Sequence, residues 1–222
     1  NKTILDNITF DVHPGQSIGI TGPSGCGKSS FVRLISALYL PTSGEVLIDG
    51  IPIHDLDLKS LRRGIGVVTQ NTIIPATSIR DFLAPSFSYS DDQIWHALEV
   101  ACLAHEVKSM PMMLDTLLSE GASNISGGQR QRLVLTKSIL KKPSILLLDE
   151  ATSALSERMQ EELDSNLSAF KITRISIAHR LSTLVRCDQI NVLMSGKIVE
   201  SGTFDELIVN GGYFANSWSN QS

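Results

Sequence analysis

The sequence contains few cysteines and no long apolar run. Its 222 residues include three cysteines, Cys26, Cys102 and Cys187, and none of them forms a CxxC pair with another. An odd number of irregularly spaced cysteines is a poor disulfide framework, and the sequence offers no cysteine pattern for a metal site. These absences favour a protein of a reducing, cytoplasmic compartment.

A segment that could cross a membrane is also lacking in the sequence. The purest apolar run spans only residues 145–148, whereas a membrane-spanning helix needs at least about 18 mostly apolar residues. No N-terminal stretch has the pattern of a signal peptide. The sequence begins with Asn1 instead of methionine, so we expect it to be a fragment of a longer protein.

A strong positive charge is absent. The chain carries 19 lysines and arginines against 23 acidic residues, which gives a net charge of −4. Without a long basic run, this balance argues against a nucleic acid as the main partner. Hydrophobic residues make up 42% of the chain and charged residues 19%, a composition typical of one large or two small folded domains and not of disorder.

Short apolar runs alternate with helical patterns along the chain. This order is typical of an α/β domain with a largely parallel sheet. Apolar runs that are bounded by turn residues predict strands. We predict parallel strands at residues 17–21, 65–69, 144–148 and 174–178, an antiparallel flank at 4–10 and 44–53 with turns at Pro14-Gly15 and Asp49-Gly50, and a hairpin at 189–194 and 197–200.

Helical periodicity fills much of the middle of the chain. Residues 91–118 show few strand signals and repeat apolar residues at helical spacing. We therefore expect a helical subdomain at about residues 78–140. Further helices are predicted at residues 28–38 and 126–140, and a capping box predicts a terminal helix that opens at Thr203.

A glycine-rich loop follows the first predicted parallel strand and opens the helix that begins at Lys28. Gly22, four further residues and the run Gly27-Lys28-Ser29 have the spacing of a phosphate loop. Glycines let backbone N–H groups turn toward phosphate oxygens, and the helix N-terminus favours an anion. We expect Lys28 to bridge the β- and γ-phosphates of ATP and Ser29 to supply a hydroxyl to Mg²⁺; the alternative is a glycine-rich structural turn. The expected nucleotide-binding residues of this loop are Gly22, Pro23, Ser24, Gly25, Cys26, Gly27, Lys28, Ser29 and Ser30.

Two carboxylates end the most apolar predicted strand. Residues 145–148 run directly into Asp149 and Glu150, at the carboxyl end of a strand, where α/β sheets place their ligands. We expect Asp149 to orient the shell of Mg²⁺ and Glu150 to polarise an attacking water as general base. An apolar strand that ends in acids is by itself a common solvated strand end, and the phosphate loop is what favours the catalytic interpretation.

A second glycine pair opens the predicted helix at residues 126–140. Ser126 can cap that helix, and Gly127 and Gly128 leave its N-terminal amides open to an anion. Gln129 completes the expected contact with the nucleotide. A plain helix cap after a loop explains the local pattern equally well.

These three segments, taken together and in this order, resemble those of the ATP-binding cassette (ABC) ATPases over essentially the whole chain. Residues 125–129 are similar to the signature motif of that family, with Ile125 where leucine is usual. The resemblance implies a P-loop NTPase fold whose RecA-like core carries the helical subdomain as an insertion. It also implies that two such domains, here expected to be identical, pair head to tail. The phosphate loop of one domain would then face Ser126, Gly127 and Gly128 of the other across each ATP.

The same resemblance assigns two more residues. Gln70 matches the Q-loop glutamine, which would contact Mg²⁺ and the attacking water, and His179 matches the switch histidine, which would contact the γ-phosphate. Taken alone, Gln70 would be an ordinary polar strand end and His179 a structural histidine. The other four histidines match nothing in the pattern and are interpreted as surface or packing residues: His13, His54, His96 and His105.

Three features depart from the family pattern. Residues 153–156 match the D-loop of the family, except that Ser156 stands where aspartate is usual. Serine can still cap the following helix, but a charge that helps shape the dimer interface is missing. Lys137 stands where arginine is usual, so the charge is kept and the bidentate fork is lost. The aromatic residue on which family members stack adenine is not found before the first strand, and Phe10 lies too late to serve.

Residues 79–83 and 202–214 resemble the exporter branch of the family, in which a membrane domain precedes the ATPase in one polypeptide. The resemblance implies ATP-driven export by a domain that lies on the cytoplasmic face of the cell (inner) membrane and contacts the coupling helices of its membrane domain. Residues 110–113 and 119–124 resemble bacterial exporters of bacteriocins and related peptides, which suggests a peptide cargo.

The sequence leaves two other functions open. The chain could be a cassette ATPase of DNA repair or ribosome regulation, or a module that binds ATP without turnover and gates its partner. Together with the segment after Gln70, Met110, Met112 and Met113 are expected to line the groove for the coupling helices, because methionine-rich surfaces adapt to partners. Ordinary packing of these methionines is the alternative.

Overall fold

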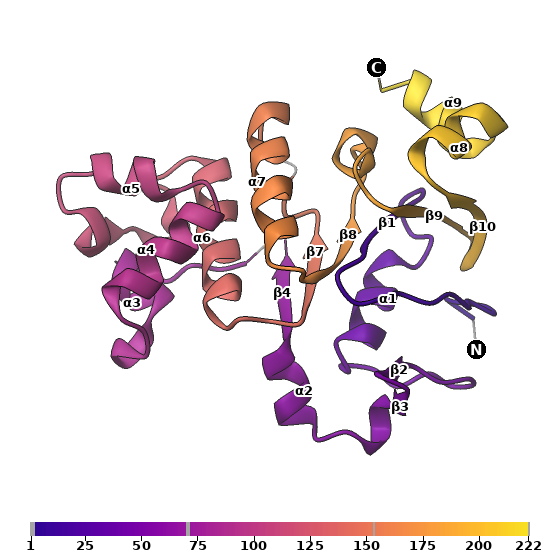
Figure 1. Ribbon diagram of the computed structural model, residues 1–222, viewed down its shortest axis with the longest axis horizontal. Coiled ribbons are helices and arrows are strands. Elements are labelled where there is room, and N and C mark those ends of the chain that lie inside the picture. Colours follow the sequence, from indigo (N-terminus) through magenta and orange to yellow (C-terminus); the bar gives the residue numbers. More distant parts are fainter. Residues whose placement is uncertain (1–2, 70–71, 153, 222) are drawn as a thin grey trace.

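The computed structural model describes residues 3–69, 72–152 and 154–221, and the centre of this part of the chain is a six-stranded sheet. The strand order is β10-β9-β1-β8-β7-β4, in which β10 is antiparallel to β9 and the other neighbours are parallel. The prediction of a mainly parallel core sheet is therefore confirmed (Figure 1). The strands are β1 (Ser17–Thr21), β4 (Ile65–Thr69), β7 (Ile145–Asp149), β8 (Thr173–Ile177), β9 (Gln189–Met194) and β10 (Lys197–Gly202).

Helices surround the sheet and also form a block beside it. Figure 1 shows α3, α4, α5 and α6 gathered on the side of α7 that is away from α1. The prediction that residues 91–118 are mostly helical is confirmed. The helices are α1 (Lys28–Ile35), α2 (Leu58–Gly64), α3 (Ile79–Leu83), α4 (Asp91–Val100), α5 (Ala104–Ser109), α6 (Gly127–Leu140), α7 (Glu157–Ala169), α8 (Phe204–Asn210) and α9 (Tyr213–Ser219), with short 3₁₀ turns η1 (Ile53–Asp55), η2 (Pro85–Phe87), η3 (Met113–Asp115), η4 (Glu120–Ala122) and η5 (Leu181–Leu184).

Strand β7 shows why the sheet is buried on both faces. Successive side chains of a strand point to opposite faces. Leu147 belongs to the same hydrophobic cluster as Phe31 of α1, whereas Leu146 and Leu148 belong to the cluster that contains Leu163 of α7. A strand covered on both faces needs an unbroken apolar sequence, and this requirement explains the apolar run that ends at the two carboxylates.

The antiparallel flank is smaller than predicted. Residues 4–10 form no strand, so this prediction is wrong. Their apolar side chains, including Leu5, Ile8 and Phe10, pack on the sheet cluster instead, and the Phe10 ring stacks on Phe31 with centroids 5.6 Å apart. Burial of alternate side chains therefore explains the strand-like pattern without a strand partner.

The predicted segment at residues 44–53 retains only two short strands, β2 (Leu47–Ile48) and β3 (Ile51–Pro52), in a sheet of their own. The predicted turn between them is confirmed. Asp49 and Gly50 both have a left-handed backbone, with φ of 51° and 77°, as a tight hairpin turn requires. A third small sheet pairs β5 (Thr77–Ser78) with β6 (Leu117–Leu118).

Two helix predictions differ from the structure at their ends. The helix that opens at Lys28 ends at Ile35 and not at residue 38, because Ala37 adopts a left-handed φ of 54°. The terminal helix opens at the predicted cap Thr203 but is followed by a second helix, since Gly211 breaks it with a φ of 67°. Within the described ranges, no helix has the length and hydropathy that a membrane span requires.

Candidate nucleotide-binding site

The sheet brings most of the predicted site residues to one edge. Thr69, Asp149 and Ile177 are level with one another at the carboxyl ends of β4, β7 and β8, and Ile20 of β1 pairs with Ile177. The residues that follow these strands therefore share the edge of the sheet where α/β proteins bind ligands. They are the glycine loop after β1, Glu150 after β7 and His179 after β8.

The glycine loop takes a conformation that only glycine accepts at two points. Gly22 has a φ of 147°, and a Cβ atom there would lie 2.0 Å from the carbonyl oxygen of Leu193. Gly27 has a φ of 117°, and a Cβ atom there would lie 2.6 Å from the side chain of Leu5. These close approaches explain why both positions require glycine. The loop tip at Pro23, Ser24 and Gly25 is exposed, as is Ser29, while Cys26 is buried.

Lys28 is held inside this loop. Its Nζ atom donates hydrogen bonds to the carbonyl oxygens of Gly22 at 2.8 Å and Pro23 at 3.0 Å, and it lies 3.8 Å from the sulfur of Cys26. The side chain is buried, with 7% of its surface exposed. The first turn of α1 contains no acidic residue, so the helix N-terminus and the ammonium group together give this loop a positive field that suits an anion.

The two carboxylates after β7 differ in their surroundings. Burial raises the pKa of Asp149, and the negative charge of Glu150 raises it further, while Lys28 and His179 act in the opposite direction. A neighbouring cation would stabilise the charged form of a carboxylate whose pKa is raised in this way. The oxygens of Asp149 and Ser29 fit Mg²⁺, because a magnesium ion bound to nucleotide phosphates needs only one or two protein ligands. In the described part of the chain, no cluster of three or more His, Cys, Asp or Glu side chains is placed to hold a metal ion by itself.

Glu150 makes an ion-pair contact with His179. Glu150 has a φ of 53°, and its backbone N–H donates to the carbonyl oxygen of Ile177 at 2.9 Å. Its Oε1 atom lies 3.2 Å from Nε2 of His179. A left-handed backbone is uncommon for a residue with a side chain and often marks a functional position. The geometry thus brings together a potential base and a potential phosphate contact.

The second glycine pair lies at the start of α6, as predicted. Ser126 and Gln129 form a capping box, in which each side chain bonds the backbone N–H of the other, at 3.1 Å and 2.8 Å. Gly127 and Gly128 lie against Ala154, since a Cβ atom on either glycine would meet an atom of Ala154 within 4 Å. Among the described residues, no side chain bonds the backbone N–H groups of Gly127 and Gly128, which the helix itself leaves unpaired.

A comparison with known protein families decides the identity of this arrangement. The family model described as ABC transporter matches residues 5–153. The chain belongs to the ABC transporter family. This match confirms the prediction of an ABC-type ATPase domain, and it spans the phosphate loop, the signature motif and the two carboxylates.

The relatives of this ABC transporter chain match almost its whole length. An ATP-dependent lipid A-core flippase of Burkholderia orbicola is 42% identical over 97% of this chain and 37% of its own length. The ATP-binding cassette sub-family B member 6 of Xenopus tropicalis is 40% identical over 99% of this chain and 26% of its own length. A solved structure of a bacterial Atm1-family ABC exporter with ATP bound has a TM-score of 0.93 and 36% identity, and the match covers 99% of this chain and 39% of the exporter chain. The chain therefore spans about two fifths or less of these relatives, and its fold is that of an exporter-type nucleotide-binding domain.

Not all predicted ABC site residues lie together in this single chain. The signature residues lie at the start of α6, on the opposite side of α7 from the phosphate loop and α1 (Figure 1). A cavity of about 140 Å³ lies beside them, lined by Thr69, Thr72, Gly127, Ala154 and neighbouring residues of α6. Gln70 lies outside the described residues, as does Ser153 of the predicted D-loop.

The departures from the ABC pattern have local explanations. Ser156 caps α7, because its Oγ accepts a hydrogen bond from the N–H of Met159 at 3.4 Å, so the predicted cap is confirmed. The Nζ atom of Lys137 lies 4.1 Å from the ring centroid of Phe82. Burial lowers the pKa of Lys137, and Lys141 lowers it further. This cation–π contact does not require the fork of an arginine.

Two positions escaped the sequence analysis. Glu106 of α5 accepts a hydrogen bond from Nε2 of Gln129 at 2.6 Å and pairs with Nη1 of Arg132 at 2.7 Å. Gln221 follows α9, and its side-chain amide bonds the backbone carbonyl of His179 and the backbone N–H of Leu181. No motif or periodicity marks either residue, because both act through contacts between distant segments.

The three methionines of the expected docking groove divide into two kinds. Met112 and Met113 are exposed, with 59% and 51% of their surface accessible. Met110 packs against the hydrophobic cluster of the helical block. Ordinary packing therefore describes Met110, whereas the other two methionines are free to meet a partner.

Proposed function

We propose that this domain binds and hydrolyses ATP with Mg²⁺ and thereby powers the export of a substrate across a membrane. The observation that carries the proposal is the meeting of the phosphate loop, Asp149 and the Glu150–His179 pair at one edge of the sheet. Phosphoryl transfer to water needs charge stabilisation and a positioned nucleophile. The residues at this edge can supply both.

The phosphate loop would take the triphosphate. The ammonium group of Lys28 now bonds the carbonyl oxygens of Gly22 and Pro23, and it would exchange these partners for oxygens of the β- and γ-phosphates, which carry full negative charge. Ser29, Asp149 and the Q-loop residue Gln70 would hold Mg²⁺. The cation neutralises charge on the phosphates when it is bound.

Glu150 would act on the attacking water. A carboxylate within hydrogen-bond reach of the water accepts its proton as the oxygen attacks the γ-phosphorus. His179, at 3.2 Å from Glu150, can hold that carboxylate in place and contact the γ-phosphate. The pair therefore orients the nucleophile and stabilises charge on the group that it attacks.

The nucleotide site would be completed by a second domain. We propose that Ser126, Gly127, Gly128 and Gln129 of one chain contact the ATP bound to the phosphate loop of an identical chain. The support is that the start of α6 lies across α7 from the phosphate loop and α1, and that the first turn of α6 itself contains no acidic residue. ATP would thus bind between two domains and draw them together, and phosphate release would part them.

A complementation experiment tests this composite site. A Lys28→Ala chain lacks the phosphate contact, and a Gly127→Glu chain places a carboxylate opposite the phosphates of its partner. A Cβ atom at Gly127 would lie 3.8 Å from the Cβ of Ala154, an ordinary contact, so a side chain can start at this position without a clash. Each variant alone should be inactive, whereas a mixture should regain ATP hydrolysis because one site of each mixed dimer is intact. A mixture as inactive as its parts would contradict the composite site.

The exporter relatives support a proposal for the partner and the place of the domain. We propose a helical subdomain at about residues 78–140 in a RecA-like core, docked on coupling helices at the cytoplasmic face of the cell membrane. Exposed Met112 and Met113 support a docking role for this block. Cross-links between a Met112→Cys variant and a coupling helix would support it, and no cross-link in any nucleotide state would overturn it.

The cargo is proposed from the sequence alone. Residues 110–113 and 119–124 resemble exporters of bacteriocins and related peptides, so we propose a peptide. The relatives include proteins named lipid A-core flippase, and a lipid is the competing cargo. Stimulation of ATP hydrolysis by a peptide in liposomes would support the proposal. Stimulation by lipid A but not by the peptide would overturn it.

A further inference from the structure

A glutamine at the end of the described chain bonds the loop that carries His179. The Nε2 atom of Gln221 donates a hydrogen bond to the backbone carbonyl of His179 at 3.0 Å. Its Oε1 atom accepts one from the backbone N–H of Leu181, also at 3.0 Å. One side-chain amide therefore holds two backbone groups that flank Arg180. In both bonds, donor and acceptor have the normal separation for a hydrogen bond.

These two hydrogen bonds lie just after strand β8, where the loop leaves the sheet. The backbone N–H of Ala178 still bonds the carbonyl of Ile20 at 3.1 Å, and the turn η5 begins at Leu181. The backbone between these two points is outside both the strand and the turn. Gln221 thus supplies support at the position that carries His179.

The segment before Gln221 is anchored on the same hydrophobic cluster as the loop. Phe214 of α9 and Leu207 of α8 are fully buried together with Ala178, Leu181 and Leu184. Such a shared core fixes the end of α9 relative to the loop on both sides of His179. A hydrogen bond between two parts of one packed core requires little further ordering of either part.

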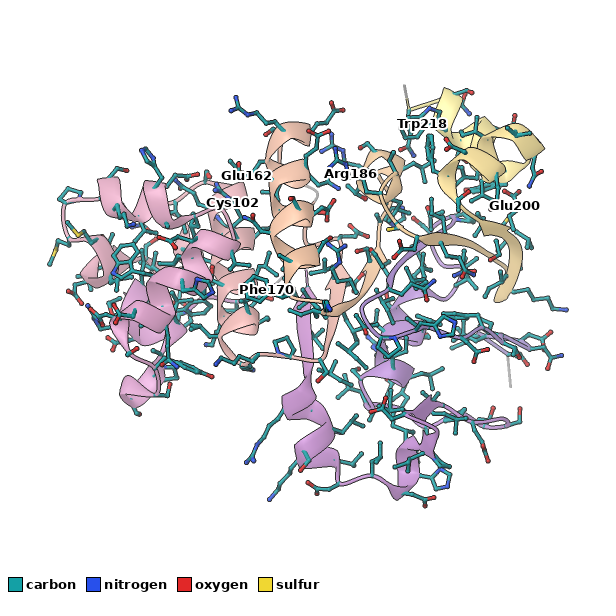
Figure 2. All side chains as sticks on the ribbon, viewed as in Figure 1. Cys102, Glu162, Phe170, Arg186, Glu200 and Trp218 are labelled. Carbon is teal, nitrogen blue, oxygen red and sulfur yellow. The ribbon has the colours of Figure 1, made fainter. Side chains whose placement is uncertain are left out.

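Further contacts hold α9 in place. The carboxylate of Glu200 on β10 accepts hydrogen bonds from the backbone N–H groups of Tyr213 and Phe214, at the N-terminus of α9. The ring of Trp218 packs edge-on against Phe204 of α8, with centroids 4.9 Å apart. Figure 2 shows Glu200 and Trp218 at the same end of the molecule, on β10 and α9. The helix that presents Gln221 is therefore fixed at its start and along its length.

We propose that Gln221 is a positioning residue for His179 in ATP hydrolysis, an inference that rests on the proposed function. His179 has 45% of its side chain exposed and contacts Glu150 through Nε2. Its position depends on its backbone, and the backbone is held by the amide of Gln221. A displacement of about 1 Å in a catalytic group can cost up to 10²-fold in rate.

The test compares Gln221→Ala with the wild type in the intact protein. We expect kcat for ATP to fall about tenfold or more, with KM nearly unchanged, because the phosphate loop is untouched. Hydrogen exchange of the Leu181 amide should become faster, because that N–H loses its acceptor. Ser219→Ala is the matched control, since its hydroxyl bonds the carbonyl of Ala215 within α9, and it should behave as wild type.

A double variant separates positioning from a general structural role. In a His179→Ala background, Gln221→Ala should have no further effect on kcat, because the residue that it positions is gone. Trp218 fluorescence should be unchanged in Gln221→Ala, which shows that α9 stays in place. An unchanged kcat in Gln221→Ala, or an equal further loss in the His179→Ala background, would overturn the inference.

The exchange measurement keeps this inference separate from the proposed function. If the wild-type protein hydrolyses no ATP, the proposed function fails. Faster hydrogen exchange of the Leu181 amide in Gln221→Ala would then still support the inference that Gln221 holds the loop in place. Unchanged exchange would overturn that control whatever the ATPase rate.

Discussion

The Nε2 atom of His179 lies 3.2 Å from the Oε1 atom of Glu150, across the carboxyl ends of β8 and β7. We propose that this contact joins the residue that polarises the attacking water with the residue that meets the γ-phosphate. In such a pair, each side chain restricts the other to the orientation that the reaction needs. The predictions below follow from this pair and from the loop and helices around it.

Replacement of His179 by alanine should slow the chemical step without removing the nucleotide. We expect kcat to fall by about 10²-fold, the usual effect of losing one charge-stabilising donor. ATP affinity, measured with a fluorescent analogue, should change little because Lys28 remains. The control is His54→Ala, an exposed histidine in 3₁₀ turn η1. An equal loss of rate in both variants would contradict the role of His179.

Replacement of Gly22 by alanine should abolish ATP binding. The added Cβ would lie 2.0 Å from the Leu193 carbonyl oxygen at a φ of 147°, so the loop could not keep its shape. Gly44→Ala is the matched control, because Gly44 lies outside the loop, has a left-handed φ of 75° and has nothing within 4 Å of its Cβ. We expect Gly44→Ala to retain binding. Normal ATP affinity in Gly22→Ala would show that the loop is not the phosphate site.

The sequence predicts the core of this fold well for a physical reason. The bounds of β1 and β4 are those predicted, and the bounds of β7 and β8 differ by one residue, because buried parallel strands require unbroken apolar runs. The glycine loop is equally predictable, since its backbone excludes other residues at Gly22 and Gly27. Side-chain burial without a strand partner made residues 4–10 look like a strand.

Contacts between distant segments could not be predicted in this way. Gln221 and Leu181 are 40 residues apart, and Glu106 and Gln129 are 23 apart. Each contact depends on how helices pack and not on any local pattern. Sequence patterns therefore predicted the groups that we propose to meet the nucleotide, while the contacts that hold these groups in place emerged from the structure.

Replacement of Glu106 by glutamine should destabilise the helical block. Arg132 has only 5% of its side chain exposed and would lose its carboxylate partner at 2.7 Å. Breaking a buried pair on one side costs about 3 kcal/mol or more, and partial exposure of Glu106 reduces this to about 2 kcal/mol. Thermal unfolding measures the loss. Glu99→Gln is the control, since its pair with Lys108 is exposed and contributes less than about 1 kcal/mol. Equal unfolding temperatures for the two variants would contradict the buried pair.

Stability should depend on the ionisation of Asp164. Burial raises the pKa of Asp164 above its ordinary value of 3.8, and Arg174 and Arg186 offset this only in part. The folded protein therefore holds the proton more tightly than the unfolded chain does. The stability that the protonated group contributes is present below pH 3.8 and is lost as the pH rises through the folded pKa.

The Asp164→Asn variant has no carboxyl group at this position to lose a proton. Its stability should therefore lack this dependence on pH. The unfolding temperature of the wild type, minus that of Asp164→Asn, should fall as the pH rises above 3.8 toward neutrality. A difference that grows over this range would mean that the contact of Asp164 with Arg174, at 3.4 Å, outweighs its burial.

The most direct test of the account is the rate of ATP hydrolysis by Glu150→Gln. Glutamine keeps the size of the side chain but cannot accept the proton of the attacking water. We expect turnover with Mg²⁺ to fall by about two to four orders of magnitude, with ATP affinity close to that of the wild type. A Glu150→Gln protein that hydrolyses ATP at the wild-type rate would contradict the account, because the reaction would then proceed without the residue placed at its centre.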